Sequence, residues 1–247
     1  MPAWVGFVFD RATGVRHVNH RTRSTLSALA LTAAAALAPT AATAAEDVGP
    51  RAVPATSLPA PCTGEYQGDA RLGPQILPRS WEAPVGPLLK HYQRMGELSP
   101  RAFLGKYWKD DSPQGPGGWK YPPNDGFAET NSGQADKHVE VLEPGESLDR
   151  FGSEYGSYLA PAGDSYAKRA LPPQNLNTRD PKYPCDYHRY AVKQPFLVWQ
   201  GRIAPWFEQP GGGQQIKLDP ALLDPGTGER LNVKWLLDHG YLAPSAG

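Results

Sequence analysis

The sequence lacks the short motifs that identify most metal sites and many hydrolases. It contains no HExxH, no CxxC pair and no calcium-loop spacing, so no metal site is predicted. Asp219, Asp224 and Glu229 surround a Pro-Gly-Thr-Gly turn, which is more typical of a connection than of a calcium site. There is also no GxSxG, which argues against a serine hydrolase.

The chain has no excess of charge of either sign and no apolar run of membrane-spanning length. Its 25 Lys and Arg residues balance its 25 Asp and Glu residues, so no general attraction to nucleic acid or to an anionic membrane is expected. The apolar run Leu26–Leu37 is shorter than the roughly 20 residues that a spanning helix needs. With 40% apolar residues, 27 Pro and 26 Gly, we expect a globular protein with many turns.

Residues 1–45 are interpreted as a signal peptide, in which the residues before about His17 are either an over-extended start or a long n-region. Arg21 and Arg23 precede the apolar run, and Ala42–Ala44 supplies the small residues of a cleavage site. Cleavage after Ala45 would leave 21 basic and 24 acidic residues, a net charge of −3. We therefore expect a secreted, extracellular protein. Residues 46–61, rich in Pro and Ala, are expected to form a linker.

Cys62 and Cys185 are the only cysteines, and both follow the cleavage region. In a secreted chain an even pair of cysteines most simply forms a disulfide. This bond would tie the N-terminal segment to the neighbourhood of Tyr187–Tyr190. The alternative is a catalytic pair of Cys185 and His188, which we disfavour because a secreted cysteine pair normally oxidises.

Hydrophobic spacing predicts a few helices followed by short strands. Val85–Met95 carries apolar residues at helical spacing, and Ser99 with Pro100 is favourable for a helix start. A last helix is predicted over Val233–His239, with Asn232 as its cap. Aromatic, β-branched or alternating residues predict four strands: His138–Leu142, His188–Val192, Phe196–Ile203 and Gln215–Leu218.

This order of elements predicts the α+β class, with a small N-terminal helical lobe packed on a C-terminal antiparallel β core. The lobe is expected over residues 62–118 and the core over residues 119–247. We expect the core to be a distorted sandwich with a ligand cleft.

The segment Leu148–Gln215 mixes Arg, Tyr, His and Gln with turn-forming Gly and Pro, which is typical of loops that gather polar groups at a site. Arg150 and Arg169 are predicted in such loops, where two guanidinium groups suit a phosphate or pyrophosphate. Surface ion pairs with nearby acids are the alternative for both. Gly211–Gly213 would either admit a ligand close to the backbone or serve as a flexible turn. Tyr121–Phe127 would either wall a flat ligand or form a packed corner.

Five runs occur in order between Tyr121 and Leu242: YPPNDGF, LDRFGSEYGSYLAP, RALPP, YHRY and GRIAPWFEQPGGGQQ. Together they resemble the family of the tuberculosis necrotizing toxin and the secreted fungal NAD glycohydrolases. The upstream runs CTGEYQGDARLGP and YWKDDSPQGPGGW are more similar to the stand-alone secreted members than to toxin domains of larger proteins.

The resemblance implies cleavage of NAD+, or NADP+, to nicotinamide and ADP-ribose. The functional arginine of the LDRFG motif corresponds to Arg150. The functional glutamine, which follows the triple glycine and one variable residue, corresponds to Gln215, and strand alternation would turn Gln214 the other way. The resemblance implies three further site groups: Tyr158, Arg169 and His188.

The expected mechanism needs no pair of catalytic carboxylates, because nicotinamide leaves as a neutral amine. We assign Arg150 and Arg169 to the diphosphate, and Gln215 to the nicotinamide ribose or the attacking water. The remaining groups are expected to orient or contact the substrate: Tyr158, His188, Tyr121, Phe127 and Gly213. NAD+ or NADP+ is a substrate here, so no cofactor is expected, and a toxin role would bring an immunity protein as partner.

Two other functions stay open at this point. An ADP-ribosyltransferase would replace water with a protein side chain, but its usual acidic residue has no clear match near Gln215. A non-catalytic secreted binding module would have no need for intact Arg150 and Gln215.

Overall fold

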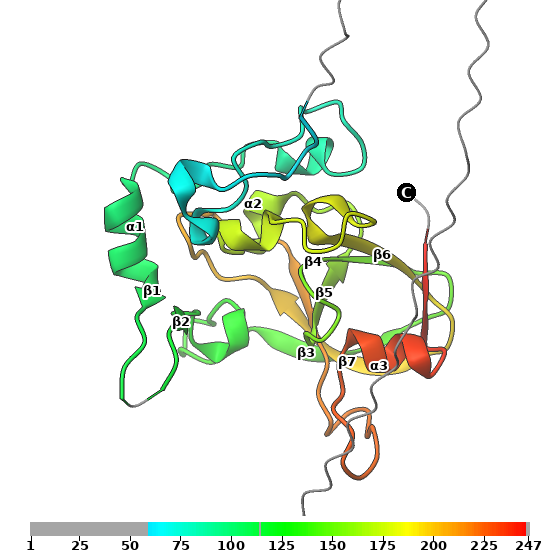
Figure 1. The fold of residues 1–247 in the computed structure, drawn as a ribbon. Coiled ribbons are helices and arrows are strands. Elements are labelled where there is room, and N and C mark those ends of the chain that lie inside the picture. The colour runs from blue at the N-terminus through cyan, green and yellow to red at the C-terminus, as the bar shows by residue number, and fades with distance from the viewer. Residues whose placement is uncertain (1–58, 114, 246–247) are drawn as a thin grey trace, which may run out of the picture. The chain divides into compact units, whose positions relative to one another are not determined.

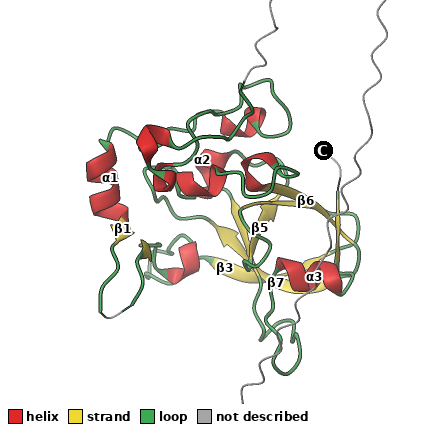
Figure 2. Cartoon of the chain, viewed as in Figure 1, coloured by secondary structure: helices red, strands yellow, loops and turns green. Residues whose placement is uncertain are grey.

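The computed structural model describes residues 59–113 and 115–245. Its central element is a seven-stranded antiparallel sheet, and a two-stranded sheet, β1 (Trp108–Lys109) with β2 (Gly118–Trp119), lies apart from it. Short helices surround the sheets (Figures 1 and 2). The predicted α+β class is confirmed. The expected signal peptide and most of the expected linker lie outside the described residues.

The large sheet is assembled from strands that are far apart in the sequence. Its spatial order is β3 (Lys137–Leu142), β7 (Phe196–Arg202), β8 (Gln214–Lys217), β5 (Tyr158–Pro161), β4 (Ser147–Phe151), β6 (Tyr187–Val192) and β9 (Leu242–Pro244). The short strand β5 joins the two halves. It pairs with β8 through Tyr158 and Leu159, and with β4 through Ala160 and Pro161.

The largest apolar cluster contains residues of both the sheet and the C-terminal helix α3 (Val233–Asp238). Leu159, Val198 and Ile216 from three strands are buried in it with Leu236 of α3. Burial of each such side chain contributes about 1.5–3 kcal/mol. This cluster fixes the strands whose other residues carry the polar groups described below.

Two smaller clusters attach the N-terminal part to the rest of the fold, one through β4 and the other through the loop that follows β7. Val85 packs in one cluster with Phe151 of β4 and Tyr166, and Phe103 packs in the other with Phe207. Phe103 belongs to α1 (Pro100–Tyr107), the one α-helix among described residues before the large sheet. The remainder of that part consists of loops, turns and 3-10 segments, so it is less helical than expected.

The capping residues predicted two of the helices correctly. The hydroxyl of Ser99 accepts a hydrogen bond from the backbone of Ala102 at the start of α1, and Asn232 caps α3 in the same way. The predicted helix over Val85–Met95 is wrong, because only a 3-10 turn, Gly86–Leu89, forms there. Pro84 and Pro87 interrupt the chain on both sides of Gly86 and cannot donate backbone hydrogen bonds. No helix of the described residues is long and apolar enough to cross a membrane.

All four predicted strands form, as β3, β6, β7 and β8, with ends that differ by one residue or so. β4, β5 and β9 were not predicted, nor was the short helix α2 (Tyr166–Arg169). The expectation that Arg150 and Arg169 lie in loops is therefore wrong: Arg150 belongs to β4 and Arg169 ends α2. Leu148 and Phe151 are the buried apolar residues of β4. A strand of this length is too short for them to produce a recognisable periodic pattern.

The predicted disulfide between Cys62 and Cys185 is confirmed, with a Cα–Cα distance of 5.0 Å. Both half-cystines are buried, and they pack in the cluster that contains Phe151 of β4. The bond therefore joins the first described segment to the turn that precedes β6, next to the strand that carries Arg150.

Replacing both cysteines by alanine should lower the free energy of unfolding by about 4 kcal/mol, because a loop of over a hundred residues is then open in the unfolded chain. Urea denaturation of the variant and the wild type measures this difference. Equal denaturation midpoints for the two proteins would show that the disulfide contributes nothing to stability.

Candidate functional site

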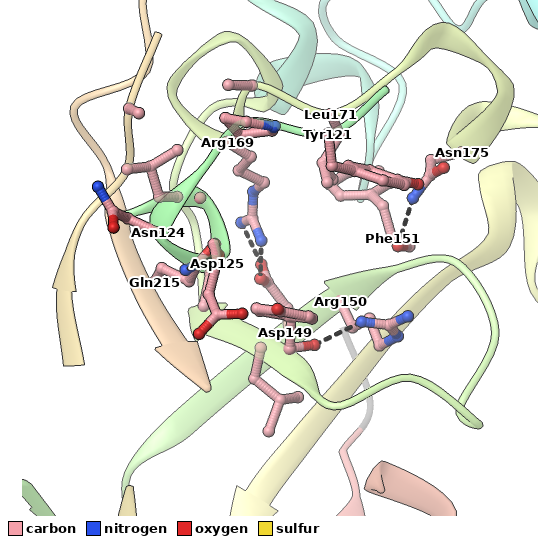
Figure 3. Close-up of a pocket in the computed structure, with 18 of the residues that line it drawn as sticks. Tyr121, Asn124, Asp125, Asp149, Arg150, Phe151, Arg169, Leu171, Asn175 and Gln215 are labelled. Atoms are coloured by element: carbon pink, nitrogen blue, oxygen red, sulfur yellow. Dashed lines mark hydrogen bonds and ion pairs between the residues drawn. The ribbon is translucent and has the colours of Figure 1, made fainter. Parts of the chain in front are cut away.

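A pocket of about 620 Å3 lies where the turn Tyr121–Gly126 faces the middle of the sheet. Figure 3 shows the side chains that project into it from β4, β5, β8 and α2. Sheet pairing explains this convergence: β8, β5 and β4 are neighbours in space, although in the sequence they are spread over residues 147–217. The lining residues used below are Tyr121, Asp125, Asp149, Arg150, Tyr158, Arg169, Asn175 and Gln215.

Arg150 enters the pocket from β4 with a guanidinium that touches no carboxylate among the described residues. Its Nε donates to the carbonyl of Ser153 at 2.7 Å, and its Nη1 donates to the carbonyl of Tyr158 at 2.5 Å. Burial lowers the pKa of Arg150 below its ordinary value, yet an arginine stays protonated at neutral pH. Gly156 lies so close that a Cβ there would stand 2.0 Å from Nη2 of Arg150. The surrounding loop thus fixes a positive charge beside the pocket.

Arg169 also lines the pocket, but its charge is offset by Asp149. The guanidinium forms two hydrogen bonds with the Asp149 carboxylate, one through Nη1 and one at 2.9 Å through Nη2. It also donates to the carbonyl of Asp164 at 3.1 and 2.8 Å. The alternative of an ion pair with Asp149 is thus confirmed for Arg169, but its surface location is wrong, because the two side chains are only 4% and 0% exposed.

Gln215 approaches the pocket from β8, on the side away from Arg150 in Figure 3. Its Nε2 donates to the backbone carbonyl of Asp125 at 2.9 Å. Gln214, its neighbour, is exposed and does not line the pocket. Strand alternation therefore selects Gln215 for the pocket, as the sequence predicted.

Two tyrosines complete the polar lining. Tyr158 of β5 has a raised pKa, mainly because its hydroxyl is removed from water and also because negative Asp125 lies nearby. Its hydroxyl thus stays protonated at neutral pH. Tyr121 is 60% exposed, although its ring packs edge-on against the ring of Phe207, with 5.7 Å between the ring centroids. The ring therefore offers a firmly supported aromatic face at the pocket.

Three of the residues predicted for the site do not line this pocket. His188 pairs with Arg150 across β4 and β6 but is buried between Asp186, at 3.2 Å, and Glu154, at 3.5 Å. Phe127 is 1% exposed, so this end of the turn forms the packed corner that the sequence left open as an alternative to a ligand wall. Gly213 lies against α2, where an added Cβ would meet the carbonyl of Lys168 at 3.0 Å. Its close contact is thus with protein backbone.

The sequence prediction missed Asp125, Asp149 and Asn175, which all line the pocket. Asp149 also accepts from the hydroxyl of Tyr187 at 2.8 Å and from the backbone of Gly163 at 3.1 Å. The sequence contained one signal for Asp149: it directly precedes Arg150 in the LDRFG motif, which forms part of β4. Nothing in the sequence near Asp125 indicates that it meets Gln215.

Among the described residues, no group of three or more His, Cys, Asp or Glu side chains is arranged to hold a metal ion. The pocket instead offers one unpaired guanidinium, a carboxamide, two phenols and a carboxylate, namely Arg150, Gln215, Tyr158, Tyr121 and Asp125. Such a set suits an elongated polar ligand that carries an anionic group and a flat ring.

Comparison with known proteins gives a consistent result. A family model described as tuberculosis necrotizing toxin matches residues 141–244. The conidial surface nicotinamide adenine dinucleotide glycohydrolase nadA of Aspergillus fumigatus is 44% identical over 196 residues, which cover 76% of this chain and 77% of that protein.

Comparison with solved structures also returned matches to toxin complexes. The tuberculosis necrotizing toxin complexed with its immunity factor is 24% identical, with a TM-score of 0.45 over 59% of this chain and 71% of that chain. Tse6 in complex with Tsi6 is 19% identical, with a TM-score of 0.29 over 45% of this chain and 72% of that chain.

Replacing Asp149 by Ala should lower the free energy of unfolding by about 3–5 kcal/mol, because the charge of the Arg169 guanidinium is then buried without a counter-charge. Chemical denaturation measures the loss. The double variant Asp149→Leu with Arg169→Met, which removes both charges, should recover most of it. A single variant as stable as the wild type would show that this ion pair does not hold the pocket wall.

Proposed function

Because this chain belongs to the family of the tuberculosis necrotizing toxin, we infer that it is an NAD glycohydrolase. It cleaves the bond between nicotinamide and ribose in NAD+ and releases nicotinamide and ADP-ribose. The observation that supports this function within the molecule is that Arg150 and Gln215 line one pocket. They are 65 positions apart in the sequence, and sheet pairing brings them to the same place.

The reaction breaks the C1′–N bond of the nicotinamide riboside, and the bonding electron pair stays on the pyridinium nitrogen. Nicotinamide thus leaves as a neutral molecule, while the ribose passes through a state with oxocarbenium character. Water adds its oxygen to C1′ and loses one proton to solvent. The protein has to bind the diphosphate, orient the ribose and position this water.

In our proposal Arg150 binds the diphosphate of the substrate. Its guanidinium has no carboxylate in contact among the described residues, and a dinucleotide diphosphate supplies the missing negative charge. Arg169 has a different part. Its charge is offset by Asp149, so we propose that it shapes the pocket wall and offers its remaining N–H to the same ligand region.

Gln215 is proposed to position the nicotinamide ribose or the attacking water. A carboxamide does not act as a base at neutral pH, so its contribution is geometric. Its Nε2 is used by the carbonyl of Asp125, which leaves Oε1 to accept from water or a hydroxyl. Tyr158 is proposed to donate its phenolic proton to the ligand. His188 is proposed to help orient the ligand indirectly, from β6, where it is the cross-strand neighbour of Arg150.

The flat ring of a substrate half is proposed to lie on Tyr121, whose face is exposed at the pocket. Phe127 and Gly213 are proposed to serve the substrate indirectly, by packing the turn and the segment that carry Asp125 and Gln215. In this view the two halves of the sheet form the distorted sandwich, and the ligand cleft is the pocket lined by Arg150 and Gln215.

We further propose that the protein acts outside the cell. The disulfide between Cys62 and Cys185 is typical of an oxidising compartment, and residues 1–45 have the composition of a signal peptide. NADP+ is a second proposed substrate. A toxin role, with an immunity protein as its partner, is the corresponding biological proposal.

Gln215→Ala should lower kcat about 100-fold or more, the usual effect of removing one group that acts in the transition state. Its melting temperature should stay near that of the wild type, since Gln215 makes one hydrogen bond at the pocket edge. Nicotinamide release from NAD+ measures activity, and Gln214→Ala is the matched control, expected to be fully active. An unfolded Gln215→Ala protein would make Gln215 a structural residue.

Arg150→Lys should raise KM for NAD+ by about tenfold or more, since lysine keeps the charge but not the planar fork that binds a diphosphate. Steady-state kinetics measure this change, and product analysis of the same reactions separates hydrolysis from transfer. Free ADP-ribose supports hydrolysis, whereas labelled protein would support a transferase. An inactive wild-type protein would support the binding module.

Tyr121→Ala should raise KM for NAD+ by about tenfold with a much smaller change in kcat, because stacking on an aromatic ring contributes about 1–3 kcal/mol per base. Tyr121→Phe keeps the ring and should behave like the wild type. Trp81→Ala removes another exposed aromatic side chain that does not line the pocket and serves as the control. An unchanged KM in Tyr121→Ala would place the flat ring elsewhere.

A further inference from the structure

The pocket contains a carboxylate for which the motifs gave no role. Asp125 lies in the turn Tyr121–Phe127, where Asn124, Asp125 and Gly126 all have positive φ, at 54°, 56° and 86°. Left-handed backbone costs roughly 1–2 kcal/mol at each position that is not glycine. The surrounding contacts hold the turn in this form: Ala204 donates its backbone N–H to the carbonyl of Gly126 at 2.9 Å.

Asp125 is the one carboxylate of the pocket lining that stays accessible to a ligand. The other, Asp149, is 0% exposed and uses both oxygens within the protein. The Asp125 side chain is 45% exposed. Its Oδ2 accepts from Lys217 Nζ at 2.6 Å, and among the described residues no hydrogen bond is made to Oδ1. One carboxylate oxygen is thus held by Lys217, and the other makes no hydrogen bond within the described residues.

The backbone of Asp125 also accepts from Nε2 of Gln215 at 2.9 Å, and Figure 3 shows both residues on the same side of the pocket. The turn and β8 therefore place a carboxylate next to the carboxamide. Since positive charge moves from the pyridinium ring to the ribose as the C1′–N bond breaks, a fixed negative charge beside that ribose would stabilise the transition state more than the bound substrate.

We propose that Asp125 is a further catalytic residue. Its carboxylate faces the nicotinamide ribose, accepts a hydrogen bond from a ribose hydroxyl and stabilises the oxocarbenium character that develops there. The proton lost by the attacking water goes to solvent and not to Asp125. This inference rests on the proposed function. It adds Asp125 as the group that compensates the positive charge developing on the ribose.

Asp125→Asn is the decisive variant because it removes the charge and keeps the backbone carbonyl that anchors Gln215. We expect kcat for NAD+ hydrolysis to fall at least about 100-fold, with KM changed less than about threefold. Lys217→Met breaks the same ion pair but keeps the carboxylate, so kcat should fall less than about tenfold. Asp136→Asn, at an exposed Asp that does not line the pocket, controls for net charge.

The outcomes are separable. Nicotinamide release by Asp125→Asn at a rate near that of the wild type would overturn the inference and leave the glycohydrolase assignment intact. Equal losses of kcat in Asp125→Asn and Lys217→Met would also overturn it, because the ion pair and not the carboxylate would then matter. A wild-type protein that releases no nicotinamide would overturn the proposed function itself. Melting temperatures of all variants show whether any loss reflects unfolding.

Discussion

The buried carboxylate of Asp149 is the constraint on which the pocket depends. A charge at 0% exposure is tolerated only where hydrogen bonds satisfy it. Asp149 receives them from Arg169 at the end of α2, from Tyr187 at the start of β6 and from the backbone of Gly163. The end of α2, the start of β6 and the turn at Gly163 are thereby held against β4, the strand that also carries Arg150.

This arrangement also sets the electrostatic character of the pocket. Asp149 is paired with Arg169, and Asp125 is paired with Lys217. Of the charged residues that line the pocket within the described chain, Arg150 is thus the one without an oppositely charged partner in contact. A ligand with a diphosphate completes this balance. The proposed substrate is therefore supported by the unpaired charge of Arg150 as well as by family membership.

The extent to which the sequence predicted this structure depends on how local each feature is. Ser99 and Asn232 predicted the starts of their helices because a cap acts within three residues. β4 and β5 were missed because strands of four or five residues are too short to show two-residue periodicity, and β4 also carries the charged residues Asp149 and Arg150. Arg150, Tyr158 and Gln215 were identified through family motifs, and their common pocket required the sheet.

The meeting of Asp125 with Gln215 was beyond any local pattern, since 90 positions separate them. It depends on the bridge between Phe127 and Ile203 and on the pairing of β7 with β8, which bring the turn to the strand. The same contacts make the turn rigid. A neutral carboxamide does not act as a base at neutral pH, so the proposed role of Gln215 depends on its orientation, which the hydrogen bond to the strained turn supports.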